Sequence, residues 1–416
     1  MSSFSIALSG LTASNSDLDV TANNIANANT VGFKSSVAEF ADVYAAGAVN
    51  LNTSSIGEGV RLDATAQQFT QGNITTTGSN LDLAISGDGF FTLADPTNGI
   101  VYTRNGQFSE DKNGNVVTAT GQALQVYPPT TTGGFNTGAL TDLNLQTAQS
   151  APLATSTGTA ILNLPADSTV LADAATADPG GTFVSTDQAS YNQSTSTTVY
   201  DSLGNAYPAT FYFTQTAKTG VWDVNMTVNG QTAGPAQQLT FDSNGAIVGN
   251  GAISFNGFAP TDGATSPQTM AFNFAQSTQY GGSFGVTSIT QNGFATGQLS
   301  TVSIDPTGIV SAVYTNGRST QLGQLALANF PDPQGLKQLG DTNWAETFTS
   351  GTAVSGTAGT AGFGSIQSGA LESSNVDLTT ELVNMITAQR AFQANAQVIT
   401  TANQLSQTVI NINSGA

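Results

Sequence analysis

Both ends of the chain carry apolar side chains at a seven-residue spacing, which is typical of amphipathic helices. From residue 4 to about residue 29 there is no proline, and the recurring positions are Phe4, Leu11, Leu18 and Ile25. Near the C-terminus the recurring positions are Leu378, Met385, Phe392 and Ile399, with Leu382 widening the stripe. The pattern predicts one helix with a narrow apolar stripe at each end.

The C-terminal pattern continues through Val398, Leu405 and Val409, and candidate N-caps stand before it at Ser373, Ser374 and Asn375. A helix of about 35 to 40 residues is roughly 55 to 60 Å long at 1.5 Å per residue. So long a helix with so narrow a stripe needs a partner. We therefore expect the two terminal helices to pair.

The middle of the chain has the pattern of short antiparallel strands joined by tight turns. Apolar and polar residues alternate, as at Trp222, Val224, Met226 and Val228. Asn-Gly, a strong hairpin signal, occurs at Asn98, Asn105, Asn113, Asn229, Asn244, Asn250, Asn256, Asn292 and Asn316. We expect Trp222 and Trp344 to be core residues of two β-domains, an outer one and an inner one.

A second turn signal is the repeated spacing Asp-x-x-Gly. It occurs at Asp111, Asp201, Asp242 and Asp305. In each repeat we expect the aspartate to bond the turn backbone and the glycine to supply a positive φ.

These patterns predict a mainly β protein with α-helical termini, in which paired helices form an inner domain carrying antiparallel β-domains of barrel or sandwich type. We assign residues 1–34 and 371–416 to the helices, and residues 35–75 and 350–370 to connecting segments. We assign residues 76–145 and 286–349 to the inner β-domain, and residues 146–285 to the outer one.

Composition excludes many kinds of chemistry. The 416 residues include no cysteine and no histidine, so disulfides, thiolate nucleophiles and histidine-based catalysis are absent. Eight Lys and Arg against 27 Asp and Glu give a net charge of -19, which disfavours nucleic acid as a partner. No apolar run is long enough to span a membrane as a helix, so we expect no membrane insertion. Because cysteine and histidine are missing, we also expect no cofactor, no metal site and no enzymatic activity.

The terminal segments are also nearly uncharged. Residues 1–30 contain Asp17 and Asp19 and no base, while residues 371–416 contain three acids and only Arg390 as a base. Exposed helices normally carry many interspersed charges, so these helices fit a crowded assembly better. Neutral polar residues, among them Asn395, Gln397, Asn403 and Gln407, are candidates for lining a water-filled channel. An antiparallel helix pair capping a monomer is the alternative.

Three segments carry a resemblance to a known family. They are residues 22–34, which include Asn23, Asn24, Asn27, Asn29, Thr30, Gly32, Phe33 and Lys34; residues 77–108, which end in Tyr102-Thr103-Arg104-Asn105-Gly106-Gln107-Phe108; and residues 374–395. In their order along the chain and in their residues, they resemble the signatures of the bacterial flagellar rod and hook axial protein family. The stretch from about residue 145 to residue 285 resembles the added outer domain of the family's hook members.

The resemblance implies a structural subunit that polymerises helically into the hook, a curved flexible tube acting as a universal joint between rod and filament. It implies as partners other copies of the chain, the distal rod, the hook cap, the hook–filament junction protein and the flagellar export apparatus. It also implies an extracellular location reached without a cleaved signal peptide. Within this interpretation, the apolar positions of both helices form a seam between and within subunits.

Two other functions stay open. A distal rod or basal-body component shares both terminal signatures, although the large middle insertion disfavours it. A monomeric secreted β-protein that binds or cleaves sugar accounts for the Thr, Asn and Gly content but not for the helical ends. For Arg104, an ion pair between subunits and a solvated strand end are equally weighted interpretations.

Overall fold

The protein consists of two compact units. The computed structural model describes residues 2–43, 57–145, 149–171 and 183–414. The first unit comprises Met1–Gln146, Thr301–Ala312 and Ser319–Ala416, and the second comprises Thr147–Ser300 and Val313–Arg318. The first unit therefore holds both ends of the chain, while the finer division expected from the sequence stays a prediction.

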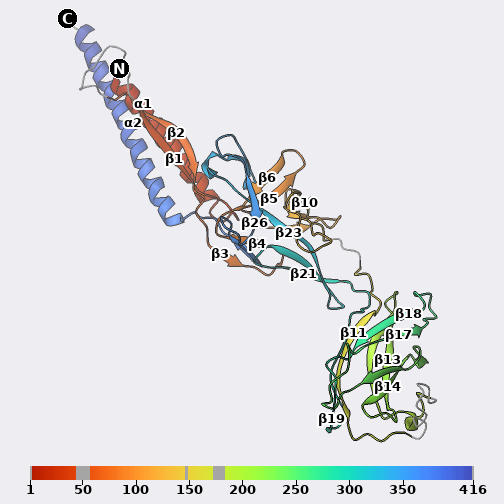
Figure 1. The fold of residues 1–416 in the computed structure, drawn as a ribbon. Helices are drawn as coiled ribbons and strands as arrows, with labels where there is room; N and C mark the ends of the chain where they lie inside the picture. The colour runs from red at the N-terminus through yellow and green to blue at the C-terminus, as the bar shows by residue number, and fades with distance from the viewer. Residues whose placement is uncertain (1, 44–56, 146–148, 172–182, 415–416) are drawn as a thin grey trace. The chain divides into compact units, whose positions relative to one another are not determined.

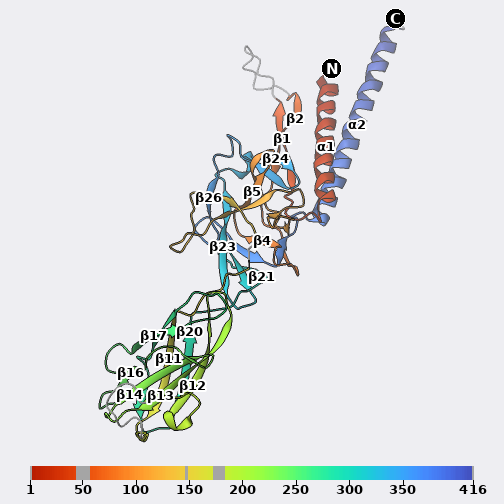
Figure 2. The same ribbon diagram turned by 90° about the vertical axis from the view of Figure 1, so that its right-hand side faces the viewer.

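Two helices lie side by side in the first unit, as Figures 1 and 2 both show. They are α1 (Ser2–Ala26) and α2 (Leu378–Ser414), and the two ends of the chain lie at the same end of the pair. The prediction of paired terminal helices in a mainly β protein is confirmed.

The N-cap of α2 differs from the candidates in the sequence. Asp377 Oδ1 accepts hydrogen bonds from the backbone N–H groups of Thr379 and Thr380, at 2.8 and 3.1 Å. A carboxylate at this position also interacts favourably with the helix dipole. The prediction of a cap at Ser373, Ser374 or Asn375 is wrong, because these residues belong to the segment that joins the helix to the β-structure.

A two-stranded ribbon accompanies α1. It consists of β1 (Ser36–Val43) and β2 (Gly59–Gln67), which pair antiparallel with an irregularity between Glu39 and Phe40. This ribbon lies in the span that the sequence predicts to be a connecting segment, residues 35–75; residues 44–56 of that span lie outside the described residues. Figure 2 shows the ribbon running along α1.

The rest of the described first unit is β-structure. Its main sheet has the strand order β21-β22-β23-β9-β5-β6-β25-β24, with β7, β8, β10 and β26 attached beside this path. The strands are β5 (Phe90–Asp95), β6 (Gly99–Thr103), β7 (Ser109–Glu110), β8 (Val116–Val117), β9 (Ala123–Tyr127), β10 (Thr141–Asp142), β21 (Leu299–Ile304), β22 (Ile309–Tyr314), β23 (Ser319–Asn329), β24 (Lys337–Gly340), β25 (Asn343–Ala345) and β26 (Val354–Thr357). A short 3-10 helix, η3 (Pro333–Gly335), precedes β24.

Two short sheets join the early part of the chain to its last strands. β27 (Ser365–Ser368) pairs with β4 (Leu83–Ser86), and β28 (Ala370–Glu372) pairs with β3 (Ile74–Thr76). Both pairings are antiparallel. They bring the segment that precedes α2 next to the segment that follows the β1–β2 ribbon.

Two apolar clusters fill the first unit. One contains Leu83, Phe91, Val101, Leu124 and Leu325, and the other is aromatic, with Phe90, Tyr102, Phe330 and Trp344. The prediction that Trp344 is a core residue is confirmed, since only 1 % of it is exposed. Its indole N–H donates to Gln67 Oε1 at 2.6 Å, which ties the end of β2 to this cluster.

The second unit has two five-stranded sheets in its described residues. One contains β11 (Thr157–Pro165), β17 (Ala252–Phe258), β18 (Gln268–Asn273), β19 (Thr278–Tyr280) and β20 (Gly285–Gln291). The other contains β12 (Gln193–Tyr200), β13 (Ala206–Gln215), β14 (Val221–Val228), β15 (Gln231–Thr232) and β16 (Gln237–Thr240). A 3-10 turn, η2 (Gln188–Ser190), precedes β12.

The core of the second unit follows the alternation seen in the sequence. Trp222, Val224, Met226 and Val228 on β14 are all fully buried, so the prediction for Trp222 is confirmed. Most strand pairs are antiparallel, as expected; β11 differs, because it pairs parallel with both β18 and β19.

The Asp-x-x-Gly prediction is confirmed at all four positions. Each aspartate Oδ1 accepts from the backbone N–H groups two and four residues later, at 2.8 to 2.9 Å. The glycines have φ of 81° at Gly114, 86° at Gly204, 77° at Gly245 and 81° at Gly308. These four turns serve to reverse strands, and nothing in them requires a bound ion.

Candidate assembly surface

The helix pair has a definite antiparallel register. Asn24 Nδ2 donates to Glu381 Oε1 at 3.0 Å near one end of the contact. Farther along, a Cβ added to Gly10 would lie 2.9 Å from the side-chain amide of Asn395. Gly10 therefore allows close approach of the helices, and Asn395 faces α1. The expectation that Asn395 lines a channel is wrong for this reason.

The seam residues expected from the sequence fall into two groups. Six are half-buried along the helix pair: Leu11, Leu18, Ile25, Met385, Phe392 and Ile399. Three are exposed, namely Phe4 at 41 %, Leu378 at 46 % and Leu382 at 51 %. Within one copy, then, the contact between the helices buries only the middle part of the expected seam.

Apolar side chains on more than one face of α2 remain uncovered in the single chain, and they include the seam residues Leu378 and Leu382. These side chains are at least 46 % exposed: Leu378, Leu382, Val383, Ile386, Val398, Leu405, Val409 and Ile410. Several of them are three, four or seven positions apart, so they share helix faces. An exposed apolar surface of this extent on a helix is typical of a protein–protein contact.

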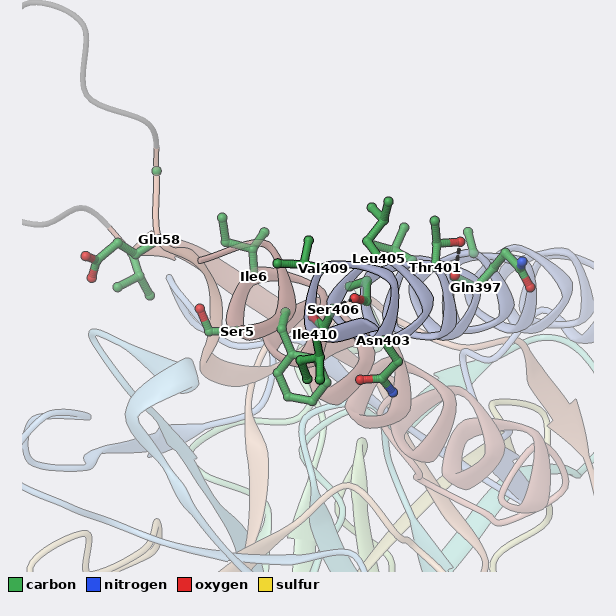
Figure 3. A pocket seen from close by; sticks show the side chains of 16 residues that line it. Ser5, Ile6, Glu58, Gln397, Thr401, Asn403, Leu405, Ser406, Val409 and Ile410 are labelled. Carbon is green, nitrogen blue, oxygen red and sulfur yellow. Dashed lines mark hydrogen bonds between the residues drawn. The ribbon is translucent and has the colours of Figure 1, made fainter. Parts of the chain in front are cut away.

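Near the chain ends, the last four of these side chains line a groove, which Figure 3 shows. Its apolar lining includes Phe4, Ile6, Val398, Leu405, Val409 and Ile410. Gln397 and Asn403, both expected on a polar face, lie among the same lining residues. The groove thus combines an apolar floor with neutral amides, and Glu58 is the charged residue at its edge.

At the other end of the helix pair lies a buried charge cluster formed by Lys34, Arg104 and Glu372. Lys34 Nζ is 2.7 Å from Glu372 Oε1, and Arg104 Nη1 is 3.4 Å from Glu372 Oε2. The three side chains are at most 4 % exposed. Both earlier interpretations of Arg104 are therefore wrong, because it is buried and pairs within its own chain.

The side chains of the cluster also form hydrogen bonds with backbone groups. Lys34 Nζ donates to the Thr70 carbonyl at 2.8 Å, and Arg104 Nη1 donates to the Gly87 carbonyl at 2.9 Å. The Gly72 N–H donates to Glu372 Oε1 at 2.8 Å. The cluster therefore connects the end of the N-terminal signature, the end of β6 in the main sheet, and β28.

One carboxylate compensates two buried cations in this cluster. Burial lowers the pKa of Lys34, and the nearby charge of Glu372 opposes that effect. Burial likewise lowers the pKa of Arg104, again opposed by Glu372. The guanidinium carbon also lies 5.3 Å from the centre of the Phe90 ring, a cation–π contact. Removal of Glu372 would leave Lys34 without an acidic neighbour and Arg104 with only the charge of Asp88.

The signature residues before Lys34 shape the exit from α1. Asn24 is buried, accepts from the Ser36 N–H at 2.9 Å and donates to the Ser36 carbonyl at 2.8 Å. Gly32 has a φ of 69°, and a Cβ there would lie 2.5 Å from the Asn105 nitrogen. Phe33 is buried beside them in sequence. This backbone path requires these residues. A larger side chain at Gly32 would not fit, and a side chain without an amide at position 24 could not bond both backbone groups of Ser36.

The other signature residues close the helix end. Asn27 Nδ2 donates to the Asn23 carbonyl at 3.0 Å, and Thr30 Oγ1 donates to Asn27 Oδ1 at 3.1 Å. Asn29 is exposed.

Sequence reasoning missed two residues of this region. Glu372 enters the sequence analysis only as one of the three acids of residues 371–416, and no local pattern singles it out. Asn375 was expected to cap α2; instead it accepts from the Ser35 N–H at 2.7 Å and donates to the Gln68 carbonyl at 2.7 Å. It therefore joins the start of β1 to the segment that leads into α2.

Other kinds of site find little support in the described part of the chain. There, no three or more acidic side chains are grouped so as to hold a metal ion. Nor does any helix within those residues combine the length and apolar character needed to cross a membrane.

Comparison with protein families gives four matches in chain order. Residues 4–34 match the flagella basal body rod protein family, and residues 84–170 match the flagellar hook protein FlgE/F/G D1 domain. Residues 163–294 match the flagellar basal body protein FlaE D2 domain, and residues 367–412 match the flagellar basal body rod FlgEFG protein C-terminal family.

Individual relatives cover nearly the whole chain. The flagellar hook protein FlgE of Escherichia coli strain K12 is 39 % identical over 417 residues, covering 98 % of this chain and 99 % of that protein. The namesake protein of Salmonella typhimurium is 40 % identical over 421 residues, covering 99 % of this chain and all of that protein. That of Borreliella burgdorferi is 31 % identical over 451 residues, covering 99 % of both.

One solved structure shares the fold. The crystal structure of Helicobacter pylori flagellar hook protein FlgE2 superposes with a TM-score of 0.50 at 13 % identity. It covers 72 % of this chain and 100 % of that one.

Proposed function

Because this chain belongs to the family of the flagellar hook protein FlgE, we propose that its copies polymerise helically into a curved hollow tube, the bacterial flagellar hook. The family is one of structural hook subunits, so the role is structural. The proposal rests on the similarity to hook proteins, which reaches 40 % identity over nearly the full length, and on the uncovered apolar side chains of α2.

The terminal helices are the proposed polymerising element. Contacts between different surfaces of successive copies generate a helical assembly when the rotation from copy to copy does not close into a ring. Of the seam residues, we assign Phe4, Leu378 and Leu382 to contacts between copies, since they are exposed in one copy. We assign Leu11, Leu18, Ile25, Met385, Phe392 and Ile399 to the contact within a copy, since they are half-buried.

We further propose that the helices form the inner wall and that neutral amides such as Gln397 and Asn403 face a channel. Side chains without charge neither hold nor repel an unfolded cargo electrostatically. Partners of this tube would be the distal rod, the hook cap, the hook–filament junction protein and the export apparatus. Its location would be extracellular, reached without a cleaved signal peptide.

The tube is proposed to work as a universal joint between rod and filament. Each row of subunits must shorten and lengthen as a bent tube rotates, so the outer β-domains must slide. Charged residues make up only 8 % of the chain, and neutral polar surfaces allow several packings of similar energy. Grafting Arg–Glu pairs between outer β-domains is expected to stiffen the hook, and unchanged bending would refute this explanation.

A rod component is the second candidate, because residues 4–34 and 367–412 match rod protein families. The match of residues 163–294 to a D2 domain and the relatives named hook protein favour the hook.

Electron microscopy of basal bodies from a strain deleted for this gene tests the proposal. We expect complete rods that end without hooks, and return of hooks when the gene is restored. Absent or truncated rods would indicate the rod instead, and intact hooks and filaments in a strain with no second copy would reject both.

A further inference from the structure

Two opposite charges on the terminal helices lack an ionic partner in the described residues. Arg390 is the one base on α2, and its side chain is exposed. Asp19 on α1 is also exposed, and Asn15 Nδ2 donates to its Oδ2 at 3.3 Å. The ion pairs found in the described residues are Lys34–Glu372, Arg61–Asp63 and Arg104–Glu372, so neither Arg390 nor Asp19 takes part in one.

The register of the helix pair places these two charges at similar heights. Asn24 lies beside Glu381, and Gly10 lies beside Asn395. Continuing this antiparallel register puts Asp19 opposite a position about four residues from Arg390. At 1.5 Å per residue, their heights along the pair differ by only about 6 Å. A second copy packed alongside, with a shift of about one helical turn, can therefore bring them together.

We propose that Arg390 of one copy forms an ion pair with Asp19 of a second copy in the polymer. The inference rests on the proposed function, because it names the charge contact that the helix-mediated assembly uses. The occupant is another copy because the partner of Arg390 must be acidic, and α1 of a second copy offers an exposed carboxylate. Complementary charges at a fixed height also define the register between copies. Each copy has a net charge of -19, so the copies would otherwise repel one another.

The other acids of the two helices are already engaged or less accessible. Asp377 caps α2, and Glu381 accepts from Asn24 within the same copy. Asp17 is half-buried by its own chain, and burial raises its pKa, so it is less available to an external guanidinium. Among the acids of the two helices, Asp19 remains as the exposed carboxylate that an arginine from outside can reach, and Asp17 provides a matched control two residues away.

A charge exchange tests the pair in the full-length protein. Arg390→Asp and Asp19→Arg, introduced singly at the chromosomal gene, are expected to lower the number of hooks per basal body by more than about tenfold, because each places like charges together. The double variant Asp19→Arg with Arg390→Asp restores the attraction and is expected to restore hooks. The control double variant, Asp17→Arg with Arg390→Asp, is expected not to restore them.

Two measurements keep the outcomes distinct. Subunit in the culture medium reports export, and circular dichroism of purified subunit reports folding, so a variant that fails in either respect is replaced by Arg390→Gln, for which we expect an intermediate loss. Normal hook numbers in a single variant, or restoration by Asp17→Arg but not by Asp19→Arg, would overturn the proposal. If the wild-type gene itself produces no hooks in this strain, it is the proposed function that fails.

Discussion

At the scale of single residues, the buried carboxylate of Glu372 has a large energetic consequence. It compensates two cations that are almost entirely removed from water. Breaking a buried ion pair by removing one partner is much more costly than losing a surface pair, since the remaining charge stays desolvated. The sequence did not reveal this cluster because Lys34 and Glu372 are 338 positions apart and only the fold brings them together.

The first prediction concerns this carboxylate. Glu372→Gln is expected to lower the free energy of unfolding of the first unit by about 3–5 kcal/mol. Urea denaturation followed by Trp344 fluorescence, in a Trp222→Phe background, measures it. The matched control is Asp63→Asn, which breaks the exposed Arg61–Asp63 pair and is expected to change stability little. Equal effects of the two substitutions would show that the cluster has no special role.

A second prediction concerns pH and the neighbouring aromatic cluster. Burial, reinforced by the charge of Glu346, raises the pKa of Tyr102 to about 12. A group whose pKa is raised on folding stabilises the protein fully below its unfolded pKa, and that stability is lost as pH rises through the folded pKa. The loss therefore falls between the model-peptide value of 10.0 and about 12.

Tyr102→Phe removes this contribution, so its free energy of unfolding is expected to fall less steeply above pH 10 than that of the wild type. The difference should approach about 2 kcal/mol near pH 12. Tyr280→Phe, at a residue that is 54 % exposed, serves as the control and should retain the wild-type slope. Parallel curves for wild type and Tyr102→Phe would contradict the assignment.

At the scale of elements, local patterns predicted what local interactions build. The Asp-x-x-Gly turns were predictable because the aspartate, its two bonded N–H groups and the glycine lie within five residues. The terminal helices were predictable because one face repeats every seven residues. The β1–β2 ribbon was not, because the irregularity at Glu39 and Phe40 interrupts its alternation and much of the ribbon stays exposed.

The third prediction tests the contact between the helices. Gly10→Val places side-chain atoms where Asn395 now lies, and overpacking of this kind costs about 1–3 kcal/mol. We expect faster amide hydrogen exchange in both α1 and α2, partly reversed by adding Asn395→Ala. Thr12→Val, at an exposed position of the same helix, should leave exchange unchanged. Identical exchange in Gly10→Val and wild type would mean that Gly10 is not the point of close approach.

At the scale of the whole molecule, the two ends of the chain lie together in one unit. The charge cluster and Asn375 join the segment that follows α1 to the segment that precedes α2. The helices extend from that junction, and apolar side chains of α2 remain uncovered. The sequence predicted the helices and their need for a partner. It left open which of their residues face the partner in the same copy, because seven-residue spacing gives a stripe but not its occupant.

Electron cryo-microscopy of hooks assembled from this protein tests the central claim most directly, namely that the terminal helices are the polymerising element. We predict that α1 and α2 of successive copies form a continuous inner wall in which Phe4, Leu378 and Leu382 are buried between copies. Hooks in which these three side chains face solvent, or in which the copies contact one another only through their β-structure, would contradict it.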